Sequence, residues 1–516
     1  MKKSIKLILT ALAVYAALLL LLLAAEAQAP DAAIDSLGDA VWFSLITMTT
    51  VGYGDLSPVT ALGRVVGAVF ALSSIGILTA LIGLGFQLLS RTIIPRMRLR
   101  LAKGSRWYAF LGESEEAAAL AQSLREEEPE CMLIFPETGT RTEATGIVRL
   151  NFSPKTLLRL RGSADGLALF AMGSDPWENY RQALSGAAEG IQSYCMADLS
   201  LDHIPPELKL FSPHEVVSRC YWKEHPLSRQ EKSIVLIGCG EAGCALLERA
   251  LLTNVFEKGR STAYHIFGSS GTFEAMHPEI LNVLGMTEAE ARKPDDDTLC
   301  FHRGSWAEAR TLLETADRIL ICGDHDSENH GIFDLLCKWF ATTGKVHVLL
   351  KDAVPGLESF GNLDECYTPE YVMKDEVNRQ AILLNDIYNE EAEHPTAWQD
   401  LSAFLKQSNV AAADHLIIKA RFLLKDESIT ALTDDICCRA YARFVELREE
   451  QAGMLQEMEH RRWMRFYQMY NWRYAPVRDN ARRRHPQMKP YEELDAENQK
   501  KDLYAWEMLG RLAQRG

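Results

Sequence analysis

The sequence has no cysteine before Cys131, and its 11 cysteines include no CxxC pair and no spacing with histidine typical of a zinc site. This argues against a disulfide framework or a structural metal and favours a reduced, cytosolic setting. Positive charge is scarce as well, since 55 Lys and Arg face 70 Asp and Glu. Phosphate backbones need a basic surface, so nucleic acid is not expected as a partner. No Ser/His/Asp set or carboxylate pair stands out, and we expect no enzyme activity.

Two long stretches lack charge altogether, Leu7–Ala25 and Val65–Ser90. A helix rises 1.5 Å per residue, so each can cross a hydrocarbon core of about 30 Å and is predicted to be transmembrane. Basic residues precede the first stretch and follow the second, so both chain ends are expected to lie in the cytoplasm. The predicted location is the inner (plasma) membrane. The N-terminus also resembles a secretory signal, but its apolar run is longer than a signal core.

The segment between these stretches is acidic. It carries Glu26, Asp31, Asp35, Asp39 and Asp55 against a single basic residue. These charges either concentrate cations at an outer mouth or form a solvated loop.

The same segment contains Thr50-Val51-Gly52-Tyr53-Gly54. A dehydrated cation needs rings of backbone carbonyl oxygens, and glycine permits the backbone conformations that aim them at one axis. The pentapeptide is the potassium-channel filter sequence, and residues 5–95 resemble the pore of two-span potassium channels. The resemblance implies a homotetramer with K+ as the permeant ion, bound at Thr50, Val51, Gly52 and Tyr53. A short re-entrant helix should precede this filter, and Gly76 is either a gating hinge or a packing glycine.

From Trp107 onward, short apolar strands alternate with helical stretches, which is typical of a parallel α/β sheet. One pattern occurs twice: a strand ends in Gly173 or Gly323, and Glu178-Asn179 or Glu328-Asn329 follows at the same offset. The repeat predicts two copies of one Rossmann-like unit.

The second copy has a glycine-rich turn between a strand and a helix, a pattern that cradles phosphate at the helix N-terminus. The residues predicted to bind a nucleotide here are Gly238, Gly240, Gly243 and Ser269. The next strand ends in Gly268-Ser269-Ser270 rather than an acidic residue, which argues against ordinary NAD binding. The possibilities that remain for this turn are a ligand with a phosphorylated ribose, a mononucleotide, or no ligand. In the first copy, Glu113 and Glu115 would repel phosphate.

A two-span pore followed by tandem Rossmann-like units resembles the regulator-of-potassium-conductance (RCK, TrkA-N-like) architecture over residues 104–372. The resemblance implies a ring of eight such units, two from each of four chains. A ligand that favours one ring shape would then pull on the second pore helix through residues 91–106.

After about Tyr367 the chain turns helical, and a helix capped by Ser408 is expected to run to Lys425. Residues 459–494 include Trp472-Arg473-Tyr474-Ala475-Pro476-Val477-Arg478-Asp479 and Arg484-His485-Pro486. They resemble the ryanodine-receptor repeat, a small helical module. Its residues Trp472, Tyr474, Arg478 and Arg484 suit stacking on a base and pairing with phosphate, or else the tryptophans are core anchors.

The predicted fold class is therefore multidomain: a two-helix transmembrane pore with a re-entrant loop, α/β Rossmann-like units and an all-α C-terminal module. We expect a pore domain at 1–103, Rossmann-like domains at 104–230 and 231–372, a helical connector at 373–440 and the repeat-like domain at 441–516. The predicted function is a homotetrameric potassium channel in a lipid bilayer, gated by a small cytoplasmic ligand of nucleotide type. The alternatives are a channel effector of a bacterial stress or antiviral system and a membrane-tethered nucleotide-dependent enzyme.

Overall fold

The computed structural model describes residues 2–27, 29–137, 146–199, 201, 204–286, 296–340, 344–392 and 394–514, except for the side chains of residues 2–9, 11–12, 73–78 and 80–81. The chain divides into two compact units, Met1–Leu101 and Ala102–Gly516. Each unit is described by itself.

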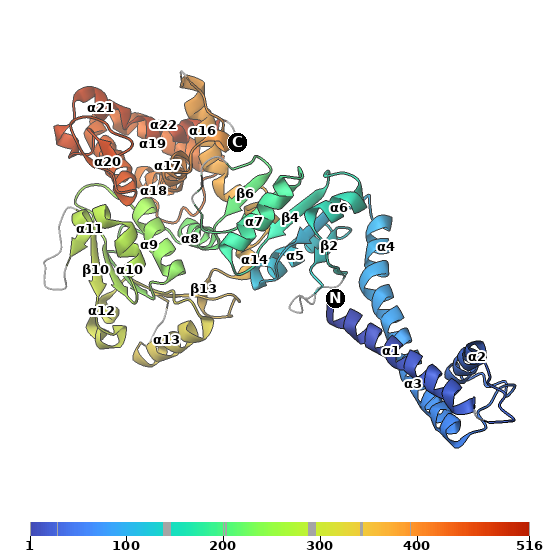
Figure 1. The fold of residues 1–516 in the computed structure, drawn as a ribbon. Coiled ribbons are helices and arrows are strands. Elements are labelled where there is room, and N and C mark those ends of the chain that lie inside the picture. Colours follow the sequence, from blue (N-terminus) through green and yellow to red (C-terminus); the bar gives the residue numbers. More distant parts are fainter. Residues whose placement is uncertain are drawn as a thin grey trace. The chain divides into compact units, whose positions relative to one another are not determined.

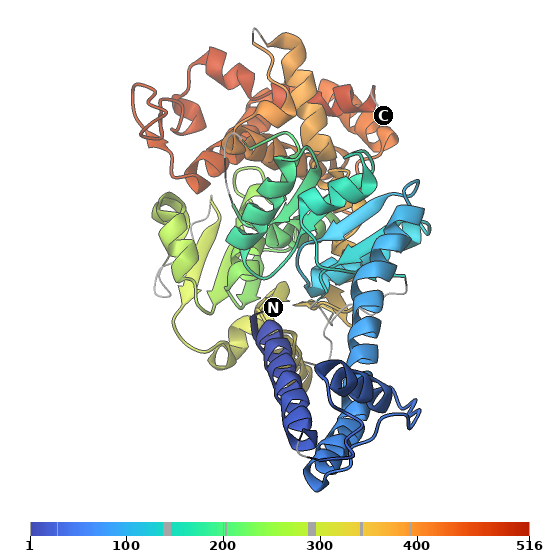
Figure 2. The ribbon, with the colours of Figure 1, turned by 45° about the vertical axis from the view of Figure 1, so that its right-hand side comes forward.

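The N-terminal unit is helical. It contains α1 (Lys2–Glu26), α2 (Leu37–Met48) and α3 (Ala61–Leu88), with α1 and α3 side by side and α2 packed on both (Figures 1 and 2). Ser36 starts α2 through a capping box with Asp39, and the Thr60 hydroxyl accepts the Gly63 N–H to start α3. Within the residues described here, none of the helices combines the length and apolar character that crossing a membrane requires.

The end of α3 is irregular. One π-helical turn, Leu89–Ile93, separates it from α4 (Ile94–Leu101), and the Ile94 N–H bonds to the Leu89 carbonyl five residues earlier. Pro95 has no N–H to continue the α-helical ladder, and a wider turn is one way to absorb that loss.

The second unit begins with a six-stranded sheet in the order β3-β2-β1-β4-β5-β6, with all described neighbours parallel. Its strands are β1 (Trp107–Phe110), β2 (Met132–Phe135), β3 (Val148–Arg149), β4 (Leu167–Ala171), β5 (Gln192–Met196) and β6 (Leu208–Phe211). Its helices are α5 (Glu115–Glu127), α6 (Pro154–Arg161), α7 (Pro176–Ala187) and α8 (Pro213–Glu224). This strand order defines the doubly wound Rossmann topology.

A second parallel sheet follows in the order β13-β12-β11-β7-β8-β10-β9, which repeats that topology with the short β9 added at one edge. Its strands are β7 (Ser233–Ile237), β8 (Ala263–Phe267), β9 (Gly285–Met286), β10 (Thr298–His302), β11 (Arg318–Ile321), β12 (Val346–Leu349) and β13 (Glu358–Phe360). Its helices are α9 (Glu241–Thr253), α10 (Gly271–Met276), α11 (Pro278–Leu284), η2 (Trp306–Glu308), α12 (Arg310–Thr315) and α13 (Asp326–Trp339). The prediction of two Rossmann-like units is confirmed.

The repeated Gly/Asn pattern makes the same contact in both sheets. The Asn179 side-chain oxygen accepts the Gly173 N–H at 2.7 Å, and its amide donates to the carbonyls of Gly173 and Met196. Asn329 bonds Gly323 twice and the Leu349 carbonyl once, each at 2.9 Å. Both asparagines are buried, and each ties the end of one strand to its neighbour.

The C-terminal part is mostly helical. Its elements are α14 (Leu363–Cys366), α15 (Pro369–Val372), η3 (Glu376–Asn378), α16 (Arg379–Glu391), η4 (Trp398–Asp400), α17 (Ala403–Asp414), α18 (Leu416–Leu424), α19 (Asp434–Glu450), α20 (Ala452–Met469), β14 (Arg473–Tyr474), β15 (Arg484–His485), η5 (Tyr491–Glu493), α21 (Ala496–Lys501) and α22 (Tyr504–Ala513). The short parallel β14–β15 pair means that this module is not purely helical.

The prediction of a helix from Ser408 to Lys425 is wrong. Ser408 lies inside α17, and the helix is capped by Ser402, whose hydroxyl accepts the Leu405 N–H. The helix ends at Asp414, and α18 starts anew after His415, whose side chain is buried against the Val255 carbonyl at 2.7 Å. Both serines have the chemistry of a cap, so local sequence does not choose between them.

One hydrophobic core joins the first sheet, the second sheet and the C-terminal helices. It includes Trp222 of α8, Phe444 of α19 and Trp506 of α22, all almost fully buried. Arg465 of α20 also pairs with Asp297, beside β10, at 2.9 Å, and both side chains are buried. The C-terminal helices therefore fold as part of the second unit.

Candidate functional site

The loop after α2 is the predicted filter. Thr50, Gly52 and Gly54 have φ of 58°, 55° and 74°, whereas Val51 and Tyr53 are not in the left-handed region. Because the sign of φ alternates, successive peptide groups point toward one side of the loop. In an extended strand, successive peptide groups point to opposite sides. Glycine adopts these angles without strain, which explains two of the three residue types.

Aromatic packing holds this loop against α2. The rings of Trp42 and Tyr53 stack with centroids 6.2 Å apart, and the Trp42 indole N–H donates to the Asp55 carboxylate at 2.9 Å. The Val51 and Gly52 N–H groups both bond to the Ile46 carbonyl at the end of α2. Trp42 thus lies beside the loop and contacts it through both its ring and its N–H group.

Glu26 has a different place from the other acidic residues of this segment. Its carboxylate is fully buried and accepts the N–H groups of Val59 and Thr60 at 2.9 and 3.0 Å and the Thr60 hydroxyl at 2.6 Å. It therefore anchors the start of α3 to the end of α1. Gly63 lies against this carboxylate, where a Cβ would clash.

The proposed hinge, Gly76, falls in the stretch of α3 whose side chains lie outside the described residues. The α-helix is assigned without interruption through it to Leu88. The irregularity of the backbone comes later, at the π-helical turn Leu89–Ile93.

The glycine turn of the second Rossmann unit is tightly packed. Gly238 has φ 103°, and a Cβ there would lie 2.6 Å from the Gly323 nitrogen, so only glycine fits. Gly240 begins α9 without a side-chain cap, and the Asp324 carboxylate lies where a Cβ of residue 240 would be. A carboxylate at a helix N-terminus is favourable, but it takes the place and the charge of a bound phosphate. Ser269 is exposed beyond this turn.

In the first unit, the loop after β1 is predicted to repel phosphate through Glu113 and Glu115, and the structure differs from this prediction at Glu113. The Glu113 carboxylate pairs with Arg149 of β3, so its charge is compensated. A hollow of about 330 Å³ lies at the carboxyl ends of these strands, the usual ligand position of a doubly wound sheet. It is lined by Leu111, Pro136, Glu137, Leu150, Asn151, Phe152, Ser153, Pro154, Gln182 and Ser185, with no basic residue.

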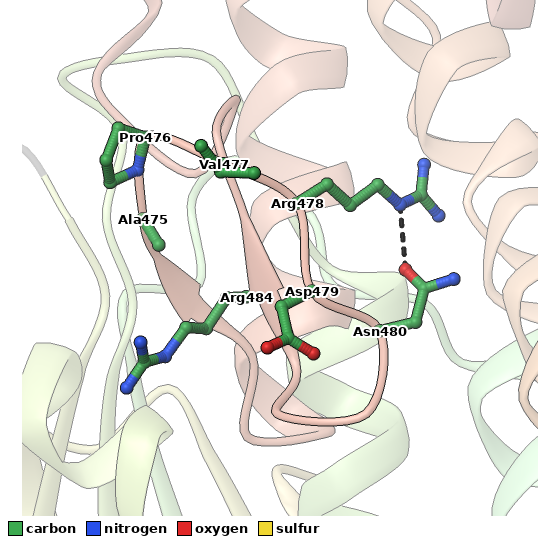
Figure 3. A pocket seen from close by; sticks show the side chains of 7 residues that line it. All are labelled: Ala475, Pro476, Val477, Arg478, Asp479, Asn480 and Arg484. Carbon is green, nitrogen blue, oxygen red and sulfur yellow. Dashed lines mark hydrogen bonds between the residues drawn. The ribbon is translucent and has the colours of Figure 1, made fainter.

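A larger hollow, of about 690 Å³, lies in the C-terminal module beside the β14–β15 pair (Figure 3). It is lined by Ala475, Pro476, Val477, Arg478, Asp479, Asn480 and Arg484. Arg478 and Arg484 lie on either side of Asp479, and the Arg478 guanidinium donates to the Asn480 side chain at 2.8 Å. Two of the four predicted ligand residues therefore border one open hollow.

The two predicted aromatic residues do not join them. Trp472 is 6% exposed and packs among Phe404, Tyr467 and His485, so its position is that of a core anchor. Tyr474 is exposed but does not line the hollow. The structure thus separates the aromatic from the basic residues of this motif.

The comparison with known proteins concerns the N-terminal unit. Residues 6–91 match the family model described as "Ion channel". Residues 6–91 form an ion-channel domain. A voltage-gated potassium channel of Aeropyrum pernix is 35% identical over 88 residues, which are 17% of this chain and 30% of that protein. The potassium voltage-gated channel subfamily A member 4 of Homo sapiens is 47% identical over 55 residues, 11% of this chain and 8% of that protein.

Likeness to solved structures is weak. The GsuK channel bound to ADP aligns with 66% of this chain and 89% of its own, at 15% identity and a TM-score of 0.30. The GsuK channel bound to NAD aligns with 67% and 78%, at 13% identity and a TM-score of 0.27. Such scores do not show a shared overall fold.

The sequence offered no sign of two further side-chain groups in the part that follows the channel domain. Strand pairing brings together His265, Cys300 and His302 in one place. In another place, His225 at the end of α8 meets His347 and Glu358 of two paired strands. Each group includes residues that are more than 30 positions apart in the sequence, so the full set forms no recognisable spacing.

Proposed function

We propose that the chain is a potassium-selective channel in which four copies surround one pore. The observation that carries this proposal is the alternating backbone of Thr50–Gly54 within the ion-channel domain. Carbonyl oxygens that face one side can replace the hydration shell of K+ only when several chains close a ring around the ion. The permeant ion would be held by Thr50, Val51, Gly52 and Tyr53 from each copy.

The proposed location is the inner (plasma) membrane. The charge-free stretches of α1 and α3 and the basic residues that flank them support it. A continuous helix with a capped start is the form in which a chain satisfies its backbone hydrogen bonds in lipid.

We further propose that a cytoplasmic anion of nucleotide type controls conduction, and that it binds at the C-terminal hollow. Arg478 and Arg484 supply two positive charges there, whereas the lining of the first-unit hollow has none. At the Gly238 turn, the Asp324 carboxylate would compete with a phosphate. Because the C-terminal module shares its core with both Rossmann-like units, ligand binding there can bias their arrangement.

The test is potassium flux into liposomes that contain the purified full chain, measured against a panel of nucleotides. We expect one nucleotide to change the flux of the wild type. The Arg478→Ala/Arg484→Ala double variant should lose this response. Arg439→Ala is the matched control, because Arg439 is exposed on α19, pairs with Asp435 and, in the described part of the chain, touches no residue that lines the hollow.

Two outcomes would count against the proposal separately. Absence of potassium flux under every condition, with the tetramer intact, would contradict the pore. An unchanged nucleotide response in the double variant would leave the pore in place but contradict the ligand site.

A further inference from the structure

The joint between the two Rossmann-like units contains an unusual set of side chains. His225 caps the end of α8, the helix that follows the first sheet, and His347 and Glu358 are register partners on β12 and β13 of the second sheet. One nitrogen of each imidazole and one carboxylate oxygen all lie within 4.8 Å of one another. From this geometry we propose that His225, His347 and Glu358 bind a divalent transition-metal ion of the zinc class.

The distances suit such an ion. Bonds of about 2.0–2.1 Å in a tetrahedral site place two ligand atoms roughly 3.3 Å apart. The His225 Nε2 atom lies 3.7 Å from the Glu358 carboxylate, so this pair needs only a small closure, and all three ligand atoms lie within 4.8 Å of one another. Two imidazoles and one carboxylate leave a fourth position for water, as in zinc sites with an open coordination position.

An unsatisfied buried atom gives a second, independent reason. His347 is 9% exposed, and its Nδ1 atom has no hydrogen-bond partner in the described part of the chain. A buried nitrogen without a partner carries an energetic penalty that a native structure usually avoids. Coordination of a metal ion by Nδ1 itself would remove that penalty.

The site is open to solvent on one side. Ions can enter there, because half of the Glu358 side chain is exposed.

The positive charge of Arg318 is the main argument against a cation here. Its guanidinium donates to both carboxylate oxygens of Glu231, at 2.7 and 2.8 Å. That pair is nearly neutral, so Glu358 gives the site a net negative charge before metal binds. Packing of the imidazoles with Tyr221 explains their burial but not the unpartnered nitrogen.

A metal at this site would tie α8 to the edge of the second sheet and so fix the two Rossmann-like units relative to each other. The other group, His265, Cys300 and His302, lies within a single sheet and would have no such effect. There the His265 and His302 ring nitrogens already hydrogen-bond to each other at 3.1 Å.

The experiment uses the purified full chain, stripped with a chelator and then titrated with Zn²⁺ and, separately, Co²⁺. We expect one tightly bound ion per chain, visible ligand-field bands with Co²⁺ and a saturable rise in the thermal unfolding temperature. Glu358→Gln and His225→Gln should each weaken Zn²⁺ binding at least tenfold. Glu358 is half exposed, so Glu358→Gln should fold normally, and its unfolding temperature without metal should match that of the wild type.

Cys300→Ser is the matched control and should leave the affinity unchanged. The proposal would be overturned by the absence of stoichiometric binding, by tight binding that survives both Glu358→Gln and His225→Gln, or by loss of the ion in Cys300→Ser alone. The last result would place the metal at the other group.

Discussion

At the scale of single residues, Asn179 and Asn329 show how a short repeat acquires a structural role. Each side chain makes three hydrogen bonds that join the ends of two parallel strands. An amide offers the acceptor and the two donors that this contact requires, and no other side chain of similar size offers all three.

Replacing Asn329 by alanine should therefore destabilise the second Rossmann-like unit. The change leaves the Gly323 N–H and two carbonyls buried without partners, and we expect a loss of about 3 kcal/mol. Denaturant unfolding of the full chain, followed by intrinsic fluorescence, would measure it. His330→Ala, at the next and exposed position, should change the stability by less than about 0.5 kcal/mol. A similar small effect for Asn329→Ala would contradict the role assigned to this asparagine.

A second residue-scale prediction concerns Asp324. If its carboxylate keeps phosphate away from the Gly238 turn, Asp324→Ala should gain affinity for a nucleotide that the wild type binds weakly or not at all there. Calorimetry on the full chain with the Arg478→Ala/Arg484→Ala background would isolate this turn from the C-terminal hollow. Tight binding to the Gly238 turn in the presence of Asp324 would contradict this interpretation.

At the scale of elements, His277 connects α9 to α20. Its Nε2 atom lies 2.8 Å from the Glu248 carboxylate and its Nδ1 atom 2.8 Å from the Met469 carbonyl. Both partners only accept hydrogen bonds, so both ring nitrogens must donate and the imidazole is protonated. Burial lowers the pKa of His277, but the hydrogen bond and charge of Glu248 outweigh it and raise the pKa above 6.5.

This contact should make stability depend on pH. A histidine whose pKa is raised on folding contributes fully below its unfolded pKa near 6.5, and the contribution is lost as pH rises through the folded value. We expect the unfolding temperature of the wild type to fall from pH 6.5 upward more steeply than that of His277→Asn. Parallel pH profiles for the two proteins would show that His277 is not protonated in this way.

The elements also show what the sequence could and could not reveal. Alternating strands and helices, the glycine turns and the repeated Gly/Asn pattern predicted both Rossmann-like units, because those signals are local. The cap of α17 was misplaced, since Ser402 and Ser408 are equally suitable. Asp324 contacts Gly240, and His225 contacts Glu358, although each pair is more than 80 positions apart in the sequence. Only the folded sheets bring such residues together.

At the scale of the whole molecule, the C-terminal helices belong to the core that both Rossmann-like units share. A chain ending at residue 440 would expose the partners of Trp506 and break the buried Arg465–Asp297 pair, whose loss alone is worth about 3–5 kcal/mol. We expect that truncation to aggregate in size-exclusion chromatography, whereas a chain ending at residue 514 should remain monodisperse. A well-behaved product that ends at residue 440 would show that the module is an independent domain.

The central claim is that Thr50–Gly54 from four chains form a filter selective for potassium. It is tested most directly by the reversal potential of the purified full chain in planar bilayers, with potassium on one side and sodium on the other. The account predicts a reversal potential displaced strongly in the direction set by potassium permeation. A potential near zero, with clear channel currents, would mean equal permeability to both ions and would contradict the claim.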